Sequence, residues 1–307
     1  MDASTNLDLP VDGQAQEAPK TDETEQRPGL TFEEIRKSPL FIPAVAILVG
    51  ILAAFWPLLN RLPEIWFGED GYYSHGVLVP LISGYVVYRW WPWIKTIPVK
   101  PAYIALLPLA AILWVTRAST VNQVDSLTSV CLILSVLFSI AFIAGWRWMG
   151  KLTLPTLYLA FAFPIWNMAI TYYTNPLQVL STKVAYRMLD YTGFHPFRDA
   201  NVIYLEGFTL DVGVPCSGLK LVLALFAFTF FFALIARLRW WANVLLVFLA
   251  LPLALFINGL RIMMIGVVGV NYGSDAGHKF HDYSGYIALI VCFFILFRIA
   301  RWLGWKD

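Results

Sequence analysis

The hydrophobic positions of this chain fall into long runs, and most polar residues lie in the segments between them. Eight apolar runs occur, at about residues 40–59, 74–91, 101–117, 127–145, 152–172, 217–236, 242–270 and 283–303. Most of them approach the ~20 residues that an α-helix needs to cross a bilayer. None shows the alternation of apolar and polar residues that is typical of membrane-barrel strands. The pattern predicts an all-α polytopic membrane protein with about eight transmembrane helices.

The composition agrees with a membrane protein, because 59% of the residues are hydrophobic and only 14% are charged. Residues 1–37 differ, since they are mostly polar, acidic and poor in aromatic residues. We predict that 1–37 is a disordered acidic cytoplasmic tail and that 38–307 is an eight-helix membrane domain. The tail lacks the apolar core of a signal peptide, so the first span is expected to act as an uncleaved signal anchor.

The positive charges predict the orientation of the helices. Most of the 22 Lys and Arg residues lie in the tail, after the second, fourth and sixth runs, and at the C-terminal end. Such segments stay in the cytoplasm by the positive-inside rule. Both termini are therefore expected inside, and segments 60–73, 118–126, 173–216 and 271–282 are expected to face outward.

The outer loop 173–216 is long enough to hold structure of its own. Apolar residues recur at helical spacing over Asn175–Tyr191, which predicts an interfacial helix lying on the membrane surface. Two β-prone runs follow, Asn201–Leu205 and Phe208–Val214, and they predict a small outer-face β-hairpin. The second run leads directly to Cys216, so the hairpin is expected to position this residue.

Cys216 differs from the two other cysteines of the chain. Cys131 and Cys292 lie in the middle of apolar spans and are expected to be small buried hydrophobic residues. Cys216 stands where the sixth span begins, at its predicted outer end, with Ser217 directly after it. No other cysteine is predicted on that side, so a disulfide within the chain is not expected. The residue is either structural or a nucleophile.

Arg261 and His281 are the other candidates for chemistry near the outer face. A charge within the seventh span costs at least ~2.5 kcal/mol, so Arg261 should face the bundle interior or reach the lipid headgroups. His278 and His281 precede the eighth span, and histidine exchanges protons near neutral pH. Asp282 follows His281, but consecutive side chains rarely face each other, so we do not assign it as an orienting carboxylate. Together Cys, Arg and His can supply a nucleophile, an anion stabiliser and a proton carrier for acyl transfer.

Several short motifs resemble those of the exosortase/archaeosortase family of membrane transpeptidases, in its bacterial exosortase form. They are Tyr73-Ser74-His75-Gly76, Asn201-Val202-Ile203, Pro215-Cys216-Ser217-Gly218, Asn258-Gly259-Leu260-Arg261 and Phe280-His281-Asp282-Tyr283-Ser284-Gly285. The resemblance covers roughly residues 40–303. Each motif is weak alone, but the ordered set is specific, because all of its members fall on the predicted outer side.

The resemblance implies a multi-pass cysteine protease or transpeptidase, a hydrolase acting on peptide bonds, in the bacterial inner membrane. Its implied substrates are secreted proteins whose C-terminal sorting signal has a Pro-Glu-Pro-like motif, a transmembrane helix and a basic tail. Such an enzyme would transfer the cleaved proteins to an envelope acceptor. Expected partners are these proteins, membrane lipid and exopolysaccharide machinery, with no nucleic acid, cofactor or metal ion.

The resemblance also implies roles for particular residues. Cys216, Arg261 and His281 are the implied catalytic residues. Arg261 is expected to stabilise the oxyanion, together with backbone amides at the start of the sixth helix. In addition, we expect substrate contacts from three further residues of the motifs, His75, Ser217 and Asn258.

Two alternatives from other classes are a transporter for envelope polysaccharide and a non-catalytic assembly scaffold. A transporter would place polar residues through the middle of several helices, and those middles are almost entirely apolar here. A scaffold would explain the outer hairpin but would not explain why a cysteine stands at the outer end of the sixth span. Hydrolysis without transfer stays open, because both reactions share an acyl-enzyme.

Overall fold

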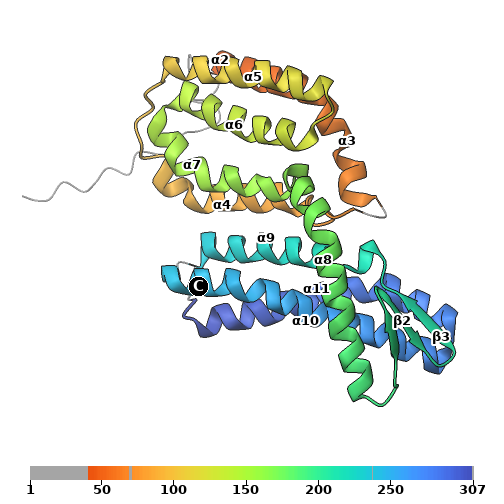
Figure 1. Ribbon diagram of the computed structural model, residues 1–307. Helices are drawn as coiled ribbons and strands as arrows, with labels where there is room; N and C mark the ends of the chain where they lie inside the picture. The colour runs from red at the N-terminus through yellow and green to blue at the C-terminus, as the bar shows by residue number, and fades with distance from the viewer. Residues whose placement is uncertain (1–40, 69–70, 237, 306–307) are drawn as a thin grey trace, which may run out of the picture. The chain divides into compact units, whose positions relative to one another are not determined.

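Helices make up most of the chain in the computed structural model, which describes residues 41–68, 71–236 and 238–305 (Figure 1). The α-helices are α2 (Phe41–Ala54), α3 (Trp56–Phe67), α4 (Leu78–Ile94), α5 (Leu106–Val121), α6 (Asp125–Ala144), α7 (Trp146–Tyr158), α8 (Asn167–Tyr191), α9 (Leu219–Ile235), α10 (Trp240–Tyr272) and α11 (Ser274–Trp302). Short 3₁₀ helices join some of them: η1 (Tyr103–Ala105), η2 (Leu159–Phe161), η3 (Pro164–Trp166) and η4 (Val214–Cys216). The predicted tail, 1–37, lies outside the described residues.

The predicted fold class, a helical multi-pass membrane protein, is confirmed. Among the described residues, 5 helices are long and apolar enough to cross a membrane, or up to 7 if each of two bent pairs is one span. Helix α4 has 17 residues, slightly fewer than the ~20 of an ordinary span. With α4 included, the helices agree with the prediction of about eight.

Two of the predicted spans contain a sharp bend near a proline. Helices α2 and α3 meet at 64°, and the segment Trp146–Phe161 meets Pro164–Tyr191 at 66°. Pro57 stands in the first turn of α3, and Pro164 begins η3. Proline lacks an amide hydrogen and disfavours helical backbone in the residue before it, so each segment starts in a new direction. The predicted first and fifth spans, ending near 59 and 172, therefore each run through a bend that the sequence did not indicate.

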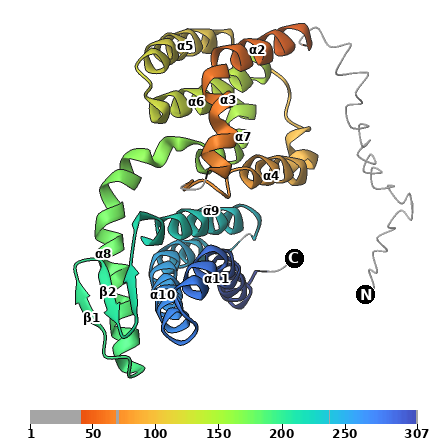
Figure 2. The same cartoon turned by 90° about the vertical axis from the view of Figure 1, so that its right-hand side faces the viewer.

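Helix α8 corresponds to the helix predicted over Asn175–Tyr191 and is longer than the sequence suggested. Its position on the membrane surface stays a prediction. It begins at Asn167 rather than Asn175 and ends at Tyr191 as predicted. In both views α8 runs across the direction of α9 and α10 rather than parallel to them (Figure 2). Buried residues of α8 pack against α10 and the β-sheet, so this helix links the sheet to the bundle.

The predicted hairpin is present, with one strand that the sequence reading missed. The strands β1 (Phe197–Asp199), β2 (Val202–Leu205) and β3 (Phe208–Asp211) form an antiparallel sheet in the order β1-β2-β3. Alternate residues of β2 and β3 face inward, and Ile203 and Leu210 are buried against α8 and α10. Strand β1 has 3 residues, too few to show an alternating pattern.

The segment between α10 and α11 corrects another expectation. Residues 271–282 were predicted as a loop, but α10 continues to Tyr272 and α11 begins at Ser274. The chain reverses at Gly273, whose φ of 90° is a conformation that favours glycine. His281 therefore lies on a helix, which restricts its direction far more than a loop would.

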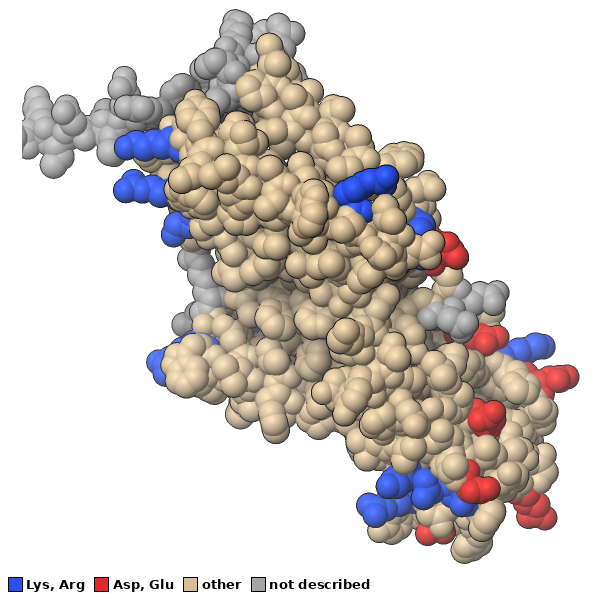
Figure 3. Space-filling view, turned by 45° about the horizontal axis from the view of Figure 1, so that its top comes forward, with Lys and Arg blue, Asp and Glu red and all other residues tan. Residues whose placement is uncertain are grey.

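Charged side chains are distributed unevenly on the face shown in Figure 3. Lys and Arg appear at both ends of this view, whereas Asp and Glu gather toward the right-hand end, where the sheet lies. The direction of the helices across a membrane remains a prediction from the positive-inside rule.

Candidate active site

Cys216 is held at the junction between the sheet and α9. Strand β3 leads through an extended Gly213 into η4, which ends at Cys216 with Pro215 in its first turn. Gly218 then adopts a φ of 81°, a left-handed conformation, before α9 begins at Leu219. The cysteine is 6% exposed and belongs to the hydrophobic cluster beneath the sheet.

His281 faces the cysteine from α11. Its Nε2 lies 3.0 Å from the Cys216 Sγ, although the two residues are 65 positions apart in the chain. This distance lets a proton pass from the thiol to the ring when Nε2 carries no hydrogen. The structure thus brings together a candidate nucleophile and a candidate base that the sequence identified separately.

Asp282 touches His281, contrary to the sequence-based expectation. The His281 Nδ1 lies 3.3 Å from the Asp282 Oδ1. Donation of Nδ1–H to this carboxylate would leave Nε2 as the acceptor facing the thiol. The Asp282 side chain is 73% exposed, so solvent weakens the interaction and any orienting effect is modest.

Arg261 joins α10 to α11 beside this pair. Its Nε donates to the Ser284 Oγ at 3.0 Å, and its Nη2 donates to the His281 carbonyl oxygen at 3.2 Å. The guanidinium also interacts electrostatically with Cys216. Within residues 41–68, 71–236 and 238–305, no carboxylate forms a salt bridge with Arg261, so its charge can face a developing anion.

Two backbone amides of the cysteine turn are already engaged within the turn. The Cys216 N–H donates to the Gly213 carbonyl at 2.9 Å, and the Ser217 N–H donates to Val214 at 3.1 Å. A donor that is used within the turn cannot bind a new oxyanion without breaking its bond. The expected contribution of amides at the start of α9, which begins at Leu219, stays a prediction.

Ser217 and Asn258, both expected to contact substrate, are buried around the cysteine turn. The Asn258 Nδ2 donates to the Cys216 carbonyl at 2.8 Å and to the Ser181 Oγ at 3.0 Å. Ser181 in turn donates to the Ser217 carbonyl at 3.2 Å. Sequence reasoning missed Ser181 and Ser284. Ser284 could have been identified, because it lies in the motif Phe280–Gly285, whereas no motif contains Ser181. The expected substrate contacts remain predictions.

Among the described residues, no hydrogen bond joins His75 to Cys216, Arg261 or His281. His75 precedes α4, is 6% exposed, and neither ring nitrogen makes a hydrogen bond of ordinary geometry with a described residue. Burial lowers the pKa of His75 to about 4, and the positive charge of Lys220 acts in the same direction. The neighbouring Tyr73 hydroxyl fixes this segment by donating to the Asn167 Oδ1 at 3.0 Å.

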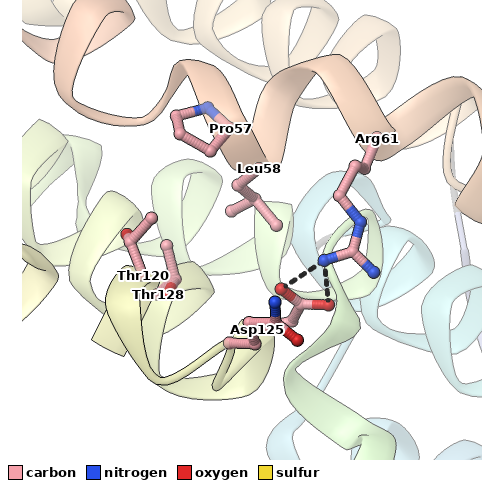
Figure 4. A pocket seen from close by; sticks show the side chains of 7 residues that line it. Pro57, Leu58, Arg61, Thr120, Asp125 and Thr128 are labelled. Carbon is pink, nitrogen blue, oxygen red and sulfur yellow. Dashed lines mark hydrogen bonds and ion pairs between the residues drawn. The ribbon is translucent and has the colours of Figure 1, made fainter. Parts of the chain in front are cut away.

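A separate pocket of about 330 Å³ lies between α3, α5 and α6. Figure 4 shows Arg61 contacting both carboxylate oxygens of Asp125 at its edge, each through Nη1 at 2.9 Å. Thr120 and Thr128 line another part of the pocket. None of its lining residues belongs to the Cys216–His281–Arg261 cluster.

The fold and this cluster define a helical multi-pass membrane protein in which a buried cysteine faces a half-buried histidine and an arginine lies beside them. The family model for the transmembrane exosortase (Exosortase_EpsH) matches residues 66–298. The chain therefore belongs to the transmembrane exosortase family, a family of membrane cysteine peptidases and transpeptidases. No curated protein and no solved structure matches the chain.

Proposed function

We propose that this protein is a membrane-embedded cysteine transpeptidase that cleaves the C-terminal sorting signals of secreted proteins and transfers these proteins to an envelope acceptor. The observation that carries the proposal is the 3.0 Å separation between the Cys216 Sγ and the His281 Nε2. Arg261, which contacts the His281 carbonyl, supplies a positive charge beside the pair. These are the three functions that acyl transfer through a thiol requires.

In the first step, the Cys216 thiol gives its proton to the His281 Nε2, and the sulfur attacks the scissile carbonyl carbon. The carbonyl oxygen becomes an oxyanion that the Arg261 guanidinium stabilises. When the carbon–nitrogen bond breaks, the leaving amine takes the proton from His281. A thioester then joins the substrate to Cys216.

In the second step, a nucleophile from an envelope acceptor attacks the thioester. His281 removes the proton of this nucleophile and returns it to the departing Cys216 sulfur. Attack by water instead would complete a hydrolysis, so the choice between the two reactions depends on which nucleophile reaches the thioester.

The substrate is a secreted protein with a Pro-Glu-Pro-like motif, a transmembrane helix and a basic tail. Its helix lies beside the bundle and brings the motif to the end of the helices that carries Cys216. In this proposal the enzyme resides in a bacterial inner membrane with both termini in the cytoplasm and its site outside. The basic segments of the sequence support this direction. Lipid and exopolysaccharide machinery are its proposed surroundings.

A processing assay in cells tests the function. A reporter that ends in such a signal is produced together with the enzyme, and the loss of its C-terminal segment is followed by gel mobility and mass. We expect Cys216→Ala to leave the reporter intact and Cys292→Ala, a change at a buried cysteine within α11, to process it. Normal processing by Cys216→Ala would contradict the proposal.

Orientation needs separate probes, because Cys216 is too buried to react readily with a large reagent. Asp275 and Lys100 are exposed, at the start of α11 and before η1 respectively. In a chain otherwise free of cysteine, an impermeant thiol reagent should label Asp275→Cys in spheroplasts. It should label Lys100→Cys only after permeabilisation. The reverse pattern would invert the proposed direction.

A further inference from the structure

A buried set of hydrogen bonds holds the backbone carbonyl groups of the turn that bears Cys216. Asn258 of α10 and Ser181 of α8 are 1% and 0% exposed, so neither residue has access to bulk solvent. Both bind carbonyl groups of the nucleophile turn, Asn258 that of Cys216 and Ser181 that of Ser217. The two side chains also bind each other at 3.0 Å.

The turn itself fits closely against this pair. A Cβ atom added to Gly218 would lie 2.8 Å from the Asn258 Nδ2 and 3.0 Å from its Cγ, so only glycine allows the approach. Gly259, next to Asn258, has a similar relation to Val184 of α8, where an added Cβ would lie 2.4 Å from the Val184 Cγ1. Helices α8 and α10 are therefore close-packed at the level of the cysteine.

The position of Asn258 relates the two halves of the candidate site. Asn258 and Arg261 lie three residues apart on α10, which places them on one face of the helix. The first binds the backbone of Cys216, and the second binds the backbone of His281. One rigid helix thus spaces the turn that bears the thiol from the helix that bears the imidazole.

We propose that Asn258 and Ser181 are positioning residues that hold the Cys216–Gly218 turn so that the thiol faces His281. This role rests on the proposed function only in taking the Cys216–His281 pair as the working pair. Neither side chain touches the reacting sulfur in the structure; each acts through a backbone carbonyl. Loss of either hydrogen bond frees the turn, and a displacement of about 1 Å can lower turnover roughly 10²-fold.

The test is a double-mutant cycle on the rate at which a small alkylating reagent, iodoacetamide, modifies Cys216 in purified full-length protein. The variants are Asn258→Ala, His281→Ala and their combination, all in a Cys131→Ala, Cys292→Ala background. If Asn258 acts by aligning the thiol with His281, Asn258→Ala should no longer change the alkylation rate once His281 is absent. If Asn258→Ala only lets the reagent reach Cys216 more easily, the alkylation rate changes by the same factor with His281 present and with His281→Ala. The coupling between the two substitutions is then zero.

We expect the effect of Asn258→Ala to differ by at least about threefold between the two backgrounds. Asn243→Ala is the matched control, because it replaces another asparagine of α10. It should change the alkylation rate by the same factor in both backgrounds. Ser181→Ala removes a single hydroxyl and repeats the test if Asn258→Ala folds poorly. The proposal would be overturned if Asn258→Ala and Ser181→Ala each changed the alkylation rate by the same factor with and without His281. Failure of the wild-type protein to process any sorting signal would count against the proposed function alone.

Discussion

Replacement of Gly218 by alanine should separate backbone strain from displacement of the cysteine turn. At a φ of 81°, a residue with a Cβ costs about 1–2 kcal/mol in stability. The new Cβ would also lie 2.8 Å from the Asn258 Nδ2, and Asn258 is buried on all sides. Relief of this overlap, by a shift of the turn or of Asn258, adds typically 1–3 kcal/mol. Because Asn258 binds the Cys216 carbonyl, turnover should fall by roughly 10²-fold.

Gly193→Ala provides a matched control. Gly193 has a φ of 84°, but no heavy atom lies within 4 Å of its added Cβ, so the variant carries the backbone cost alone. Both purified variants are compared in detergent by thermal unfolding and by turnover of a peptide that carries a C-terminal sorting signal. Gly218→Ala should be the less stable of the two and far less active. Equal turnover of the two variants would refute the reasoning that connects the turn to catalysis.

Three further predictions concern the charged and titratable residues. Arg261→Lys should lower turnover by about 10²-fold or more, because lysine cannot donate to Ser284 and His281 in two directions at once; near-normal turnover would reduce Arg261 to a simple charge. His281→Ala should lower turnover by about 10²-fold or more, whereas His278→Ala, beyond contact with the thiol, should be nearly neutral; equal losses would argue against a proton-transfer role. His75 has a pKa of about 4 in the folded protein, below its usual 6.5, so the unfolded chain binds a proton here first as the pH falls. The free energy of unfolding should therefore be unaffected by His75 above pH 6.5 and should decrease as the pH falls from 6.5 toward 4. Unfolding measured across this range should show a smaller decline in His75→Gln, and an unchanged slope would place the effect elsewhere.

The helical fold was predictable because apolar length determines which segments can cross a bilayer. The bends were harder to foresee, since the apolar runs continue through the breaks near Pro57 and Pro164. The segment 271–282 is polar and suggested a loop, yet a single turn at Gly273 is enough to join two long helices. The length of an apolar run therefore identifies the membrane region but does not show where a helix bends or where the chain reverses.

The candidate site was predictable in its residue types and less so in its supports. Cys216, Arg261 and His281 stood out because reactive side chains are unusual at the ends of apolar spans. Ser181 did not stand out, because its partners are main-chain groups that only the packing of α8 against α10 brings near. Asp282 was set aside by a rule about neighbouring side chains, and the structure nevertheless places it 3.3 Å from the histidine. Contacts with backbone and between adjacent residues leave little trace in sequence spacing.

The central claim is that Cys216 forms a covalent thioester with the sorted protein, and trapping this intermediate tests it most directly. Purified enzyme is mixed with a peptide that carries the complete C-terminal signal, quenched in acid after a short time, and examined by intact-protein mass spectrometry. We predict an added mass equal to the N-terminal part of the peptide less one water, removable by hydroxylamine and located at Cys216. The adduct should be absent from Cys216→Ala. Cleavage of the peptide by wild-type enzyme with no adduct at any time, or cleavage by Cys216→Ala at the wild-type rate, would contradict the account.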